Sequence, residues 1–238
     1  MSFPGGTSVS RLSVYTGRCA ADGLAGGTPH LHTASTEAYV VIAGAGALHT
    51  LDTGGFRETP LAAGTTVWFT PGAIHRAVNH GDLHVVVIMS NAGLPEAGDA
   101  VMTFPPDVVA DPDRYRQAAT LPRDASPEEL DEAVHRRREL AVAGFRALTA
   151  AASDGDLGPL HRLYDSAVAL VRLRVAGWRE TWRQNVERQT RHTGDILDAL
   201  EHGDGGHLSA SALLESPQSS TAGWGMCGRL RTHDVTHP

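Results

Sequence analysis

Four residues in the first third of the chain have the types and the spacing of a metal site: His30, His32, Glu37 and His75. Side chains on an extended strand alternate between its two faces, so the first two imidazoles point to the same side. A glutamate follows five residues later, and the third histidine comes three residues after a Pro-Gly pair. Imidazole nitrogens and carboxylate oxygens are ligands of divalent transition metals. The spacing therefore predicts that these four side chains converge on one metal ion.

The charge of this ligand set indicates what such a metal could do. Three neutral imidazoles and one carboxylate leave a divalent ion with a net charge of about +1 and about two open coordination positions. Open positions are typical of a catalytic metal rather than a structural one. These ligand types are compatible with Fe, Mn, Ni, Co or Zn, so the identity of the metal is not determined by the sequence.

Two further residues, Tyr39 and His49, are candidates for catalysis. Tyr39 is two positions from Glu37 and should face the same interior, where it could bind a substrate or act as an acid. A hydrogen-bonded core tyrosine is an equally good interpretation. His49 is a candidate general base whose face the pattern leaves open, and a surface histidine is the favoured alternative.

Short β-strands are predicted to position these residues between residue 8 and about residue 89. Runs rich in Val, Ile and Thr alternate with turn signals, for example at residues 44–46 and 80–82. Strands that recur at roughly 8–12 residues are typical of a β-sandwich or barrel. We expect strands at residues 9–15, 30–31, 37–43, 47–51, 66–69, 75–79 and 84–89.

A proline-rich segment separates this part from a helical one. Five prolines between residues 91 and 123 exclude a continuous helix or a central strand, so we expect an irregular connection that wraps over the barrel. Ser126, Pro127 and Glu129 have the pattern of a helix N-cap with a capping box, and this helix should run to about Ala151. A second helical stretch with an apolar stripe extends from about residue 158 to about residue 201.

The sequence thus predicts an α+β protein in four parts. An antiparallel β-barrel spans residues 1–92, and the connection spans residues 93–125. A helical region with two long helices spans residues 126–203, and a loosely ordered tail spans residues 204–238. Because the apolar stripe is broad for a helix attached to so small a barrel, we expect a homodimer or a higher oligomer, with the helices or the sheet edges in the interface.

Composition narrows the class of protein. The chain has 238 residues, is 41% hydrophobic and carries a formal charge of −7, which argues against a nucleic-acid partner. Its longest apolar runs are too short to cross a bilayer, and no signal peptide is visible, so we expect a cytoplasmic protein without a membrane partner. The two cysteines, Cys19 and Cys227, are interpreted as free buried thiols.

Two segments of the chain resemble the two signature motifs of the cupin superfamily. The first motif is a glycine, a His-x-His pair, a glutamate and a further glycine, matched here at Gly27, His30, His32, Glu37 and Gly44. The second motif is matched at Gly64, Pro71, Gly72, His75 and Asn79. The resemblance covers residues 8–92 and implies a small jelly-roll barrel that holds a metal in its mouth through His30, His32, Glu37 and His75. The helical region lies outside it.

Three functions are compatible with these residues. The first is a metal-dependent cupin enzyme that performs Lewis-acid, isomerase-type chemistry on a small oxygenated substrate, such as a sugar or a hydroxy or keto acid. The second is an Fe(II)-dependent cupin dioxygenase with the same ligands. The third is a cupin that binds or senses a metabolite without turning it over.

Overall fold

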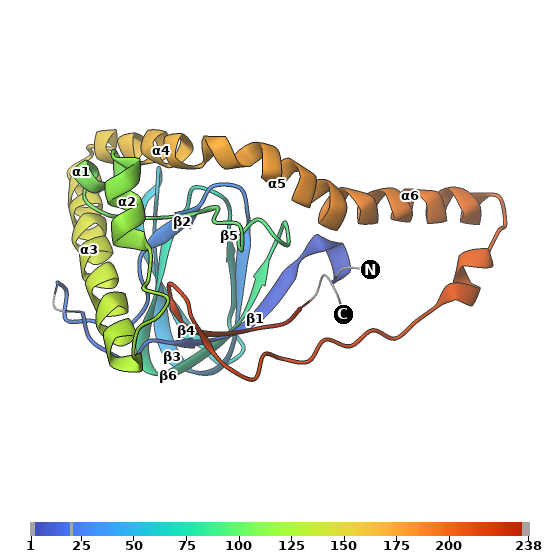
Figure 1. Cartoon of the computed structure of the whole chain (residues 1–238), viewed down its shortest axis with the longest axis horizontal. Helices are drawn as coiled ribbons and strands as arrows, with labels where there is room; N and C mark the ends of the chain where they lie inside the picture. The colour runs from blue at the N-terminus through green and yellow to red at the C-terminus, as the bar shows by residue number, and fades with distance from the viewer. Residues whose placement is uncertain (1–2, 20, 235–238) are drawn as a thin grey trace.

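The computed structural model describes residues 3–19 and 21–234, in which an antiparallel β part is followed by helices (Figure 1). The α+β class predicted from the sequence is confirmed. The strands are β1 (Ser8–Val14), β2 (His30–His32), β3 (Glu37–Asp52), β4 (Gly55–Ala62), β5 (Thr66–Phe69), β6 (Ile74–Met89), β7 (Ala100–Met102), β8 (Gly223–Trp224) and β9 (Gly228–Thr232). The α-helices are α1 (Pro106–Val109), α2 (Pro112–Ala119), α3 (Pro127–Ser153), α4 (Gly158–Val171), α5 (Val175–Trp182) and α6 (Arg188–Glu201).

All the strands belong to one antiparallel sheet that curls round an interior (Figure 1). Its order is β4-β3-β6-β1-β9-β8, while β2 pairs with β6 and β7, and β5 pairs with β3. The hydrogen-bonded order does not return on itself, so within the described residues the expected barrel is not closed.

The central strands β3 and β6 are longer than the sequence predicts. Each joins two expected strands across a segment that we interpreted as a turn, at residues 44–46 and 80–82. Gly44 has φ +76° and Asp82 has φ +46°, and these conformations shift the pairing register instead of ending the strands. A Cβ atom at Gly44 would lie 2.0 Å from the carbonyl oxygen of Asp82, so only glycine fits this bulge. Strand β4 is missing from the prediction, because its polar residues and Pro60 resemble a loop.

Two hydrophobic cores hold the molecule together. The inner core fills the curled sheet and includes Tyr39, Leu48 and Val85. The outer core lies between the sheet and the helices and includes Leu31, Ile74 and many apolar residues of α3 and α4. Because Leu31 and Ile74 pack against the helices, the alternation of β2 and β6 turns their histidine neighbours to the interior.

Helix α3 begins with the predicted capping box. The Ser126 hydroxyl accepts a hydrogen bond from the Glu129 amide at 3.2 Å, and the Glu129 carboxylate accepts one from the Ser126 amide at 2.8 Å. The helix ends at Ser153, two residues beyond the predicted end. The second helical stretch covers 158–201 as α4, α5 and α6, joined by a 3₁₀ turn (Arg172–Arg174) and a π turn (Arg183–Glu187).

The connection over residues 93–125 is more regular than expected. Pro106 and Pro112 occupy the first positions of α1 and α2, where a missing amide hydrogen costs nothing. The apolar residues Val101 and Met102 form β7 against β2 and join the outer core. Proline therefore starts helices here instead of preventing them.

The prediction of a loosely ordered tail is wrong for residues 223–232. Strands β8 and β9 form a hairpin, and β9 pairs with β1 from Ser10 to Val14. Arginine stacking on Trp224, with the Arg229 guanidinium 3.9 Å from the ring centroid, supports this hairpin. The last four residues of the predicted tail, 235–238, lie outside the described residues. Among the described helices, none combines the length and the apolar character needed to cross a bilayer.

Candidate metal centre

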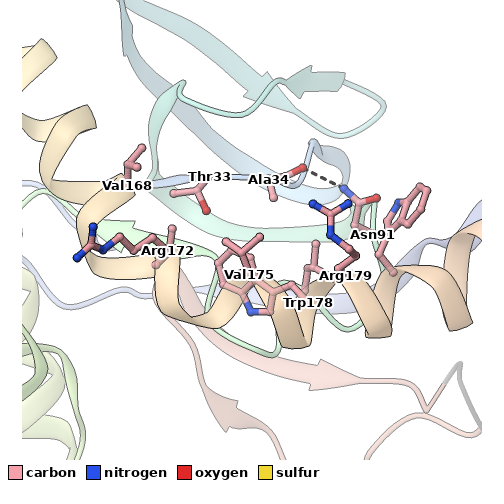
Figure 2. Close-up of a pocket in the computed structure, with 11 residues that line it drawn as sticks. Thr33, Ala34, Asn91, Val168, Arg172, Val175, Trp178 and Arg179 are labelled. Atoms are coloured by element: carbon pink, nitrogen blue, oxygen red, sulfur yellow. Dashed lines mark hydrogen bonds between the residues drawn. The ribbon is translucent and has the colours of Figure 1, made fainter.

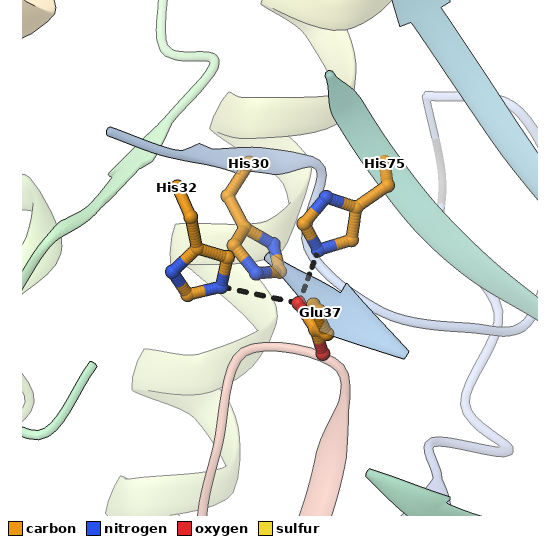
Figure 3. Close-up of side chains that lie close together, drawn as sticks. All are labelled: His30, His32, Glu37 and His75. Atoms are coloured by element: carbon orange, nitrogen blue, oxygen red, sulfur yellow. Dashed lines mark ion pairs between the residues drawn. The ribbon is translucent and has the colours of Figure 1, made fainter. Parts of the chain in front are cut away.

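The structure brings His30, His32, Glu37 and His75 into one cluster (Figure 3). Each offers one ligand atom, and these atoms all lie within 4.8 Å of one another. The residues come from β2, the start of β3 and the start of β6. Register pairing places His30 directly opposite His75, so the cluster follows from how β2 meets β6.

Each imidazole is held through its Nδ1 atom. Nδ1 of His30 lies 2.8 Å from the carbonyl oxygen of Thr28, and Nδ1 of His75 lies 3.2 Å from that of Ala73. Nδ1 of His32 lies 2.6 Å from a carboxylate oxygen of the buried Asp99. A nitrogen that faces a carbonyl or carboxylate oxygen carries the hydrogen, so each ring presents the lone pair of its Nε2 atom as a ligand.

The donor atoms fit a bound cation. Oε2 of Glu37 lies 3.1 Å from Nε2 of His32 and 3.0 Å from Nε2 of His75. Oε2 of Glu37 and Nε2 of His75 are buried and have no hydrogen-bond partner in the described part of the chain. Lone pairs that face one another at this distance repel unless a proton or a metal ion lies between them. Three imidazoles with one carboxylate are a suitable donor set for a divalent transition metal.

Burial and neighbouring charges shift the pKa values of three residues in the cluster. Burial, with His75 and His32 nearby, lowers the pKa of His30 well below its usual value. Burial also favours neutral His32, but the facing carboxylates of Asp99 and Glu37 outweigh it and raise the pKa of His32 to about 10. Burial opposes the charge of Glu37, yet the facing His75 and His32 hold its pKa well below the usual range. A metal that binds here would therefore displace a proton from His32.

The surroundings of the cluster are closed and mostly apolar. His75 is fully buried, whereas His32 and Glu37 each retain 6% of their exposure. The Phe69 ring lies with its centroid 4.1 Å from that of His75, and the Tyr39 ring lies edge-on to Phe69 at 5.4 Å. These rings shield this side of the cluster from solvent.

Tyr39 lies in the interior, as strand alternation predicts, and it is completely buried. Its hydroxyl donates a hydrogen bond to Sγ of Cys227 at 3.6 Å. Burial, followed by the effects of Cys227 and Glu37, raises the pKa of Tyr39 well above its usual value. The phenol therefore keeps its proton, and its role in catalysis remains a prediction.

Cys227 and Asp99 are neighbours of the cluster that the sequence did not reveal. The turn before β9 passes close to Glu37, as the pale red ribbon in Figure 3 shows. Its Cys227 accepts the hydrogen bond from Tyr39, and the Met226 carbonyl accepts one from the Thr28 amide at 2.9 Å. Both cysteines are free and buried, as predicted. Burial, with Glu37 nearby, raises the pKa of Cys227 to about 12, so this thiol is inert. Asp99 lies in no motif, and only the fold brings its carboxylate to His32 and to the Ser35 amide.

The structure does not bring His49 to the cluster. Within β3 and β6, Thr50 is paired with His75, and His49 is paired with Arg76 on the opposite face. Nε2 of His49 lies 2.7 Å from the Glu58 carboxylate, and the ring packs edge-on against Phe56. Only 8% of His49 is exposed, so the surface alternative is wrong as well. The bulge at Gly44 fixes this parity, and the sequence alone does not show the bulge.

Comparison with known proteins gives a family for the β part. Residues 21–91 match the family model described as "Cupin domain". No curated protein matches the chain significantly.

Solved structures with a similar β part share little sequence. A double-stranded β-helix protein from Klebsiella pneumoniae is 20% identical, covering 38% of this chain and 70% of its own, with a TM-score of 0.30. The Streptomyces nucleoside dehydratase Pac13 is 19% identical, covering 42% and 69%, with a TM-score of 0.31. The capsular polysaccharide assembling protein CapF from Staphylococcus aureus is 20% identical, covering 42% and 29%, with a TM-score of 0.32.

These TM-scores are too low to support any statement about activity, so the assignment rests on the family match and on the four clustered side chains. Residues 21–91 include both segments that resemble the cupin motifs and all four residues of the cluster. The helices lie outside the match. The chain therefore contains a cupin domain, which is followed by a helical region.

Proposed function

We propose that the protein is a metal-dependent enzyme that acts on a small oxygenated metabolite, a sugar or a hydroxy or keto acid, in an isomerase-type reaction. The observation that carries this proposal is the buried cluster, in which three imidazoles and one carboxylate converge. The Nδ1 atom of each imidazole faces a carbonyl or carboxylate oxygen of the same chain, which fixes the ring. Such an outer shell orients ligands for a metal and is common to catalytic sites.

His30, His32, Glu37 and His75 would hold one divalent transition metal, whose identity is open. When bound, this metal would supply a Lewis acid that polarises a substrate carbonyl. The chain itself would supply the orientation of the ligands, because Asp99 and two backbone carbonyls fix the imidazoles. Phe69 and Tyr39 would exclude water from the reacting centre.

Tyr39 would be the polar group that meets the substrate. Its hydroxyl proton points to Cys227, a weak acceptor that a substrate oxygen could replace. A phenol that keeps its proton would donate a hydrogen bond to an oxygen on which negative charge develops. A site bordered by the buried rings of Phe69 and Tyr39 favours a compact substrate over a polymer.

Elemental analysis of the protein purified without oxygen tests this proposal. We expect about one metal per chain in the natural protein and none in a His30→Ala/His32→Ala variant. His49→Ala is the matched control, because it removes an imidazole on the other face of the sheet and should keep the metal. Absence of metal from the natural protein would overturn the proposal.

The metal and the reaction together separate the proposal from its alternatives. Turnover of a sugar or a hydroxy or keto acid without oxygen consumption, lost in Glu37→Gln, would support it. Iron accompanied by oxygen uptake would replace it with the Fe(II) dioxygenase. Metabolite binding without any turnover would replace it with the sensor or binding protein.

A further inference from the structure

The long helical stretch extends far beyond the β part of the molecule. Its first half packs on the sheet through buried residues such as Trp178, and Asn185 donates a hydrogen bond to the Ala92 carbonyl at 2.8 Å. Gln189 donates a hydrogen bond to the Phe3 carbonyl and accepts one from the Gly6 amide, each at 3.2 Å. The chain next meets the β part at Ser216, whose carbonyl oxygen lies 2.9 Å from Nδ1 of His233. Residues 192–217, which we call the arm, continue as α6 and then return through a 3₁₀ turn and an extended segment (Figure 1).

The arm exposes apolar side chains that no described part of the chain covers. None of its residues is buried, and five of its leucines are between 46% and 87% exposed: Leu197, Leu200, Leu208, Leu213 and Leu214. An exposed apolar surface of this kind marks a site of interaction. A helix end without tertiary packing is also only marginally stable in water. The arm therefore needs a partner surface.

A matching surface lies on the first half of the same helical stretch. A groove of about 500 Å³ runs between α4–α5 and the loops of the sheet (Figure 2). Its lining is apolar and includes Ala34, Leu94, Val175 and Trp182. Val168 lines it too and is 62% exposed, so the groove is uncovered.

The charges of the arm and of the groove helix are opposite. Residues 168–191 contain six arginines and two glutamates, and Arg172 and Arg179 line the groove. The arm contains five acidic residues and no lysine or arginine, and three of the five, Asp195, Asp198 and Glu201, flank its leucines on α6. Opposite charges around apolar surfaces direct association and fix its register.

The arm of a chain cannot reach the groove of the same chain. Leu197 lies 22 residues after Val175 in a nearly continuous helical stretch, which at 1.5 Å per residue places them about 33 Å apart. Bending the stretch back would break the helix and the hydrogen bonds of Asn185 and Gln189 to the Ala92 and Phe3 carbonyls. The partner must therefore be another molecule.

We infer that the partner is a second copy of this chain, and that each arm covers the groove of the other copy in a two-fold dimer with antiparallel helices. A two-fold arrangement gives both arms and both grooves the same partner surface. With the axis between residues 186 and 187, Glu201 lies opposite Arg172, and Asp195 lies beside Arg179. Leu197 and Leu200 then enter the groove near Val175.

Light scattering at micromolar concentration tests the dimer. We expect twice the 25.2 kDa of one chain for the natural protein and a single-chain mass for Leu197→Glu/Leu200→Glu. Arg57→Glu is the control, because it changes an exposed arginine on β4 that belongs to neither the arm nor the groove, and this variant should remain dimeric. A natural protein that is monomeric, or a leucine variant that stays dimeric, would overturn the inference.

A charge exchange tests the register and guards against misfolding. Arg172→Glu/Arg179→Glu should weaken dimerisation by at least about tenfold. Adding Asp195→Arg/Glu201→Arg to the same chain should restore the dimer, which an unfolded variant could not do. If the variant with all four substitutions is folded by circular dichroism but does not dimerise, the antiparallel register is contradicted.

Discussion

The cluster of His30, His32, Glu37 and His75 and the arm differ in how far one chain supplies the contacts that each of them needs. At the cluster, three imidazoles have an Nδ1 partner from the same chain, and all four residues are at least 94% buried. In the arm, no residue is buried and the leucines face solvent. The cluster is therefore arranged to take up a single ion, whereas the arm requires a macromolecular surface.

This difference separates two properties of the protein: metal binding, which needs only an ion, and stability of the arm, which needs another protein surface. Side chains that already converge, and whose rings are fixed through their Nδ1 atoms, bind an ion without rearranging. An exposed apolar segment is stable only when another surface removes it from water. Metal binding should thus belong to each single chain, and stability of the arm should belong to the assembly.

The largest expected effect is loss of the metal in His75→Ala. Removing one of four ligands opens the cluster, so bound metal should fall from about one per chain to almost none in elemental analysis. Glu37→Gln should do the same with a nearly unchanged volume, which separates ligand loss from a cavity. Both variants should keep the mass of the natural protein, and full metal retention would contradict the assigned ligands.

A smaller effect is expected for Asp99→Asn, which leaves all four ligands in place. The carboxylate lies 2.6 Å from Nδ1 of His32, and loss of its charge should weaken metal affinity by about 10–100-fold. Competition with a chelator measures this affinity. Asp131→Asn on the exposed face of α3 is the control, and equal affinities in the two variants would show that Asp99 does not support the cluster.

The bulge that sets the faces of β3 can be broken by Gly44→Ala. The new Cβ would meet the Asp82 carbonyl at 2.0 Å with φ at +76°, so unfolding free energy should fall by more than about 1 kcal/mol. Gly64→Ala is the matched control, because φ is +91° there but no atom lies within 4 Å. Urea unfolding compares them, and equal losses would mean that the close contact at Gly44 relaxes freely.

The smallest expected effect is the change in metal content per chain when the dimer is lost. Leu197→Glu/Leu200→Glu should lose the dimer and still carry the same metal content per chain as the natural protein, because the cluster takes no residue from the arm. Elemental analysis of the fraction with single-chain mass measures this. Metal lost together with the dimer would show that the cluster depends on the second copy and would end the distinction.

The cupin domain and its cluster were accessible from sequence because their signals are local. His30 and His32 are related by the two-residue period of a strand, and Glu37 follows within the next strand. The capping box at Ser126 and Glu129 is likewise a four-residue pattern, so the start of α3 was predicted correctly. The cytoplasmic location and the substrate stay predictions.

The errors come from interactions between distant segments. Gly44 resembles a turn until β6 is paired alongside it, and that pairing turns His49 away from His75. The tail resembles a loose segment until β9 adds to β1. In both cases a partner strand supplies hydrogen bonds that no local pattern announces.

The sequence by itself determined the four converging side chains, the α+β order and the start of α3, because strand alternation and helix capping act over a few residues. Only the tertiary structure decided that Asp99 holds His32, that Cys227 lies beside Tyr39 and that His49 faces Glu58. These contacts join residues that pairing and packing bring together, and their free energy exists only once the whole sheet has formed.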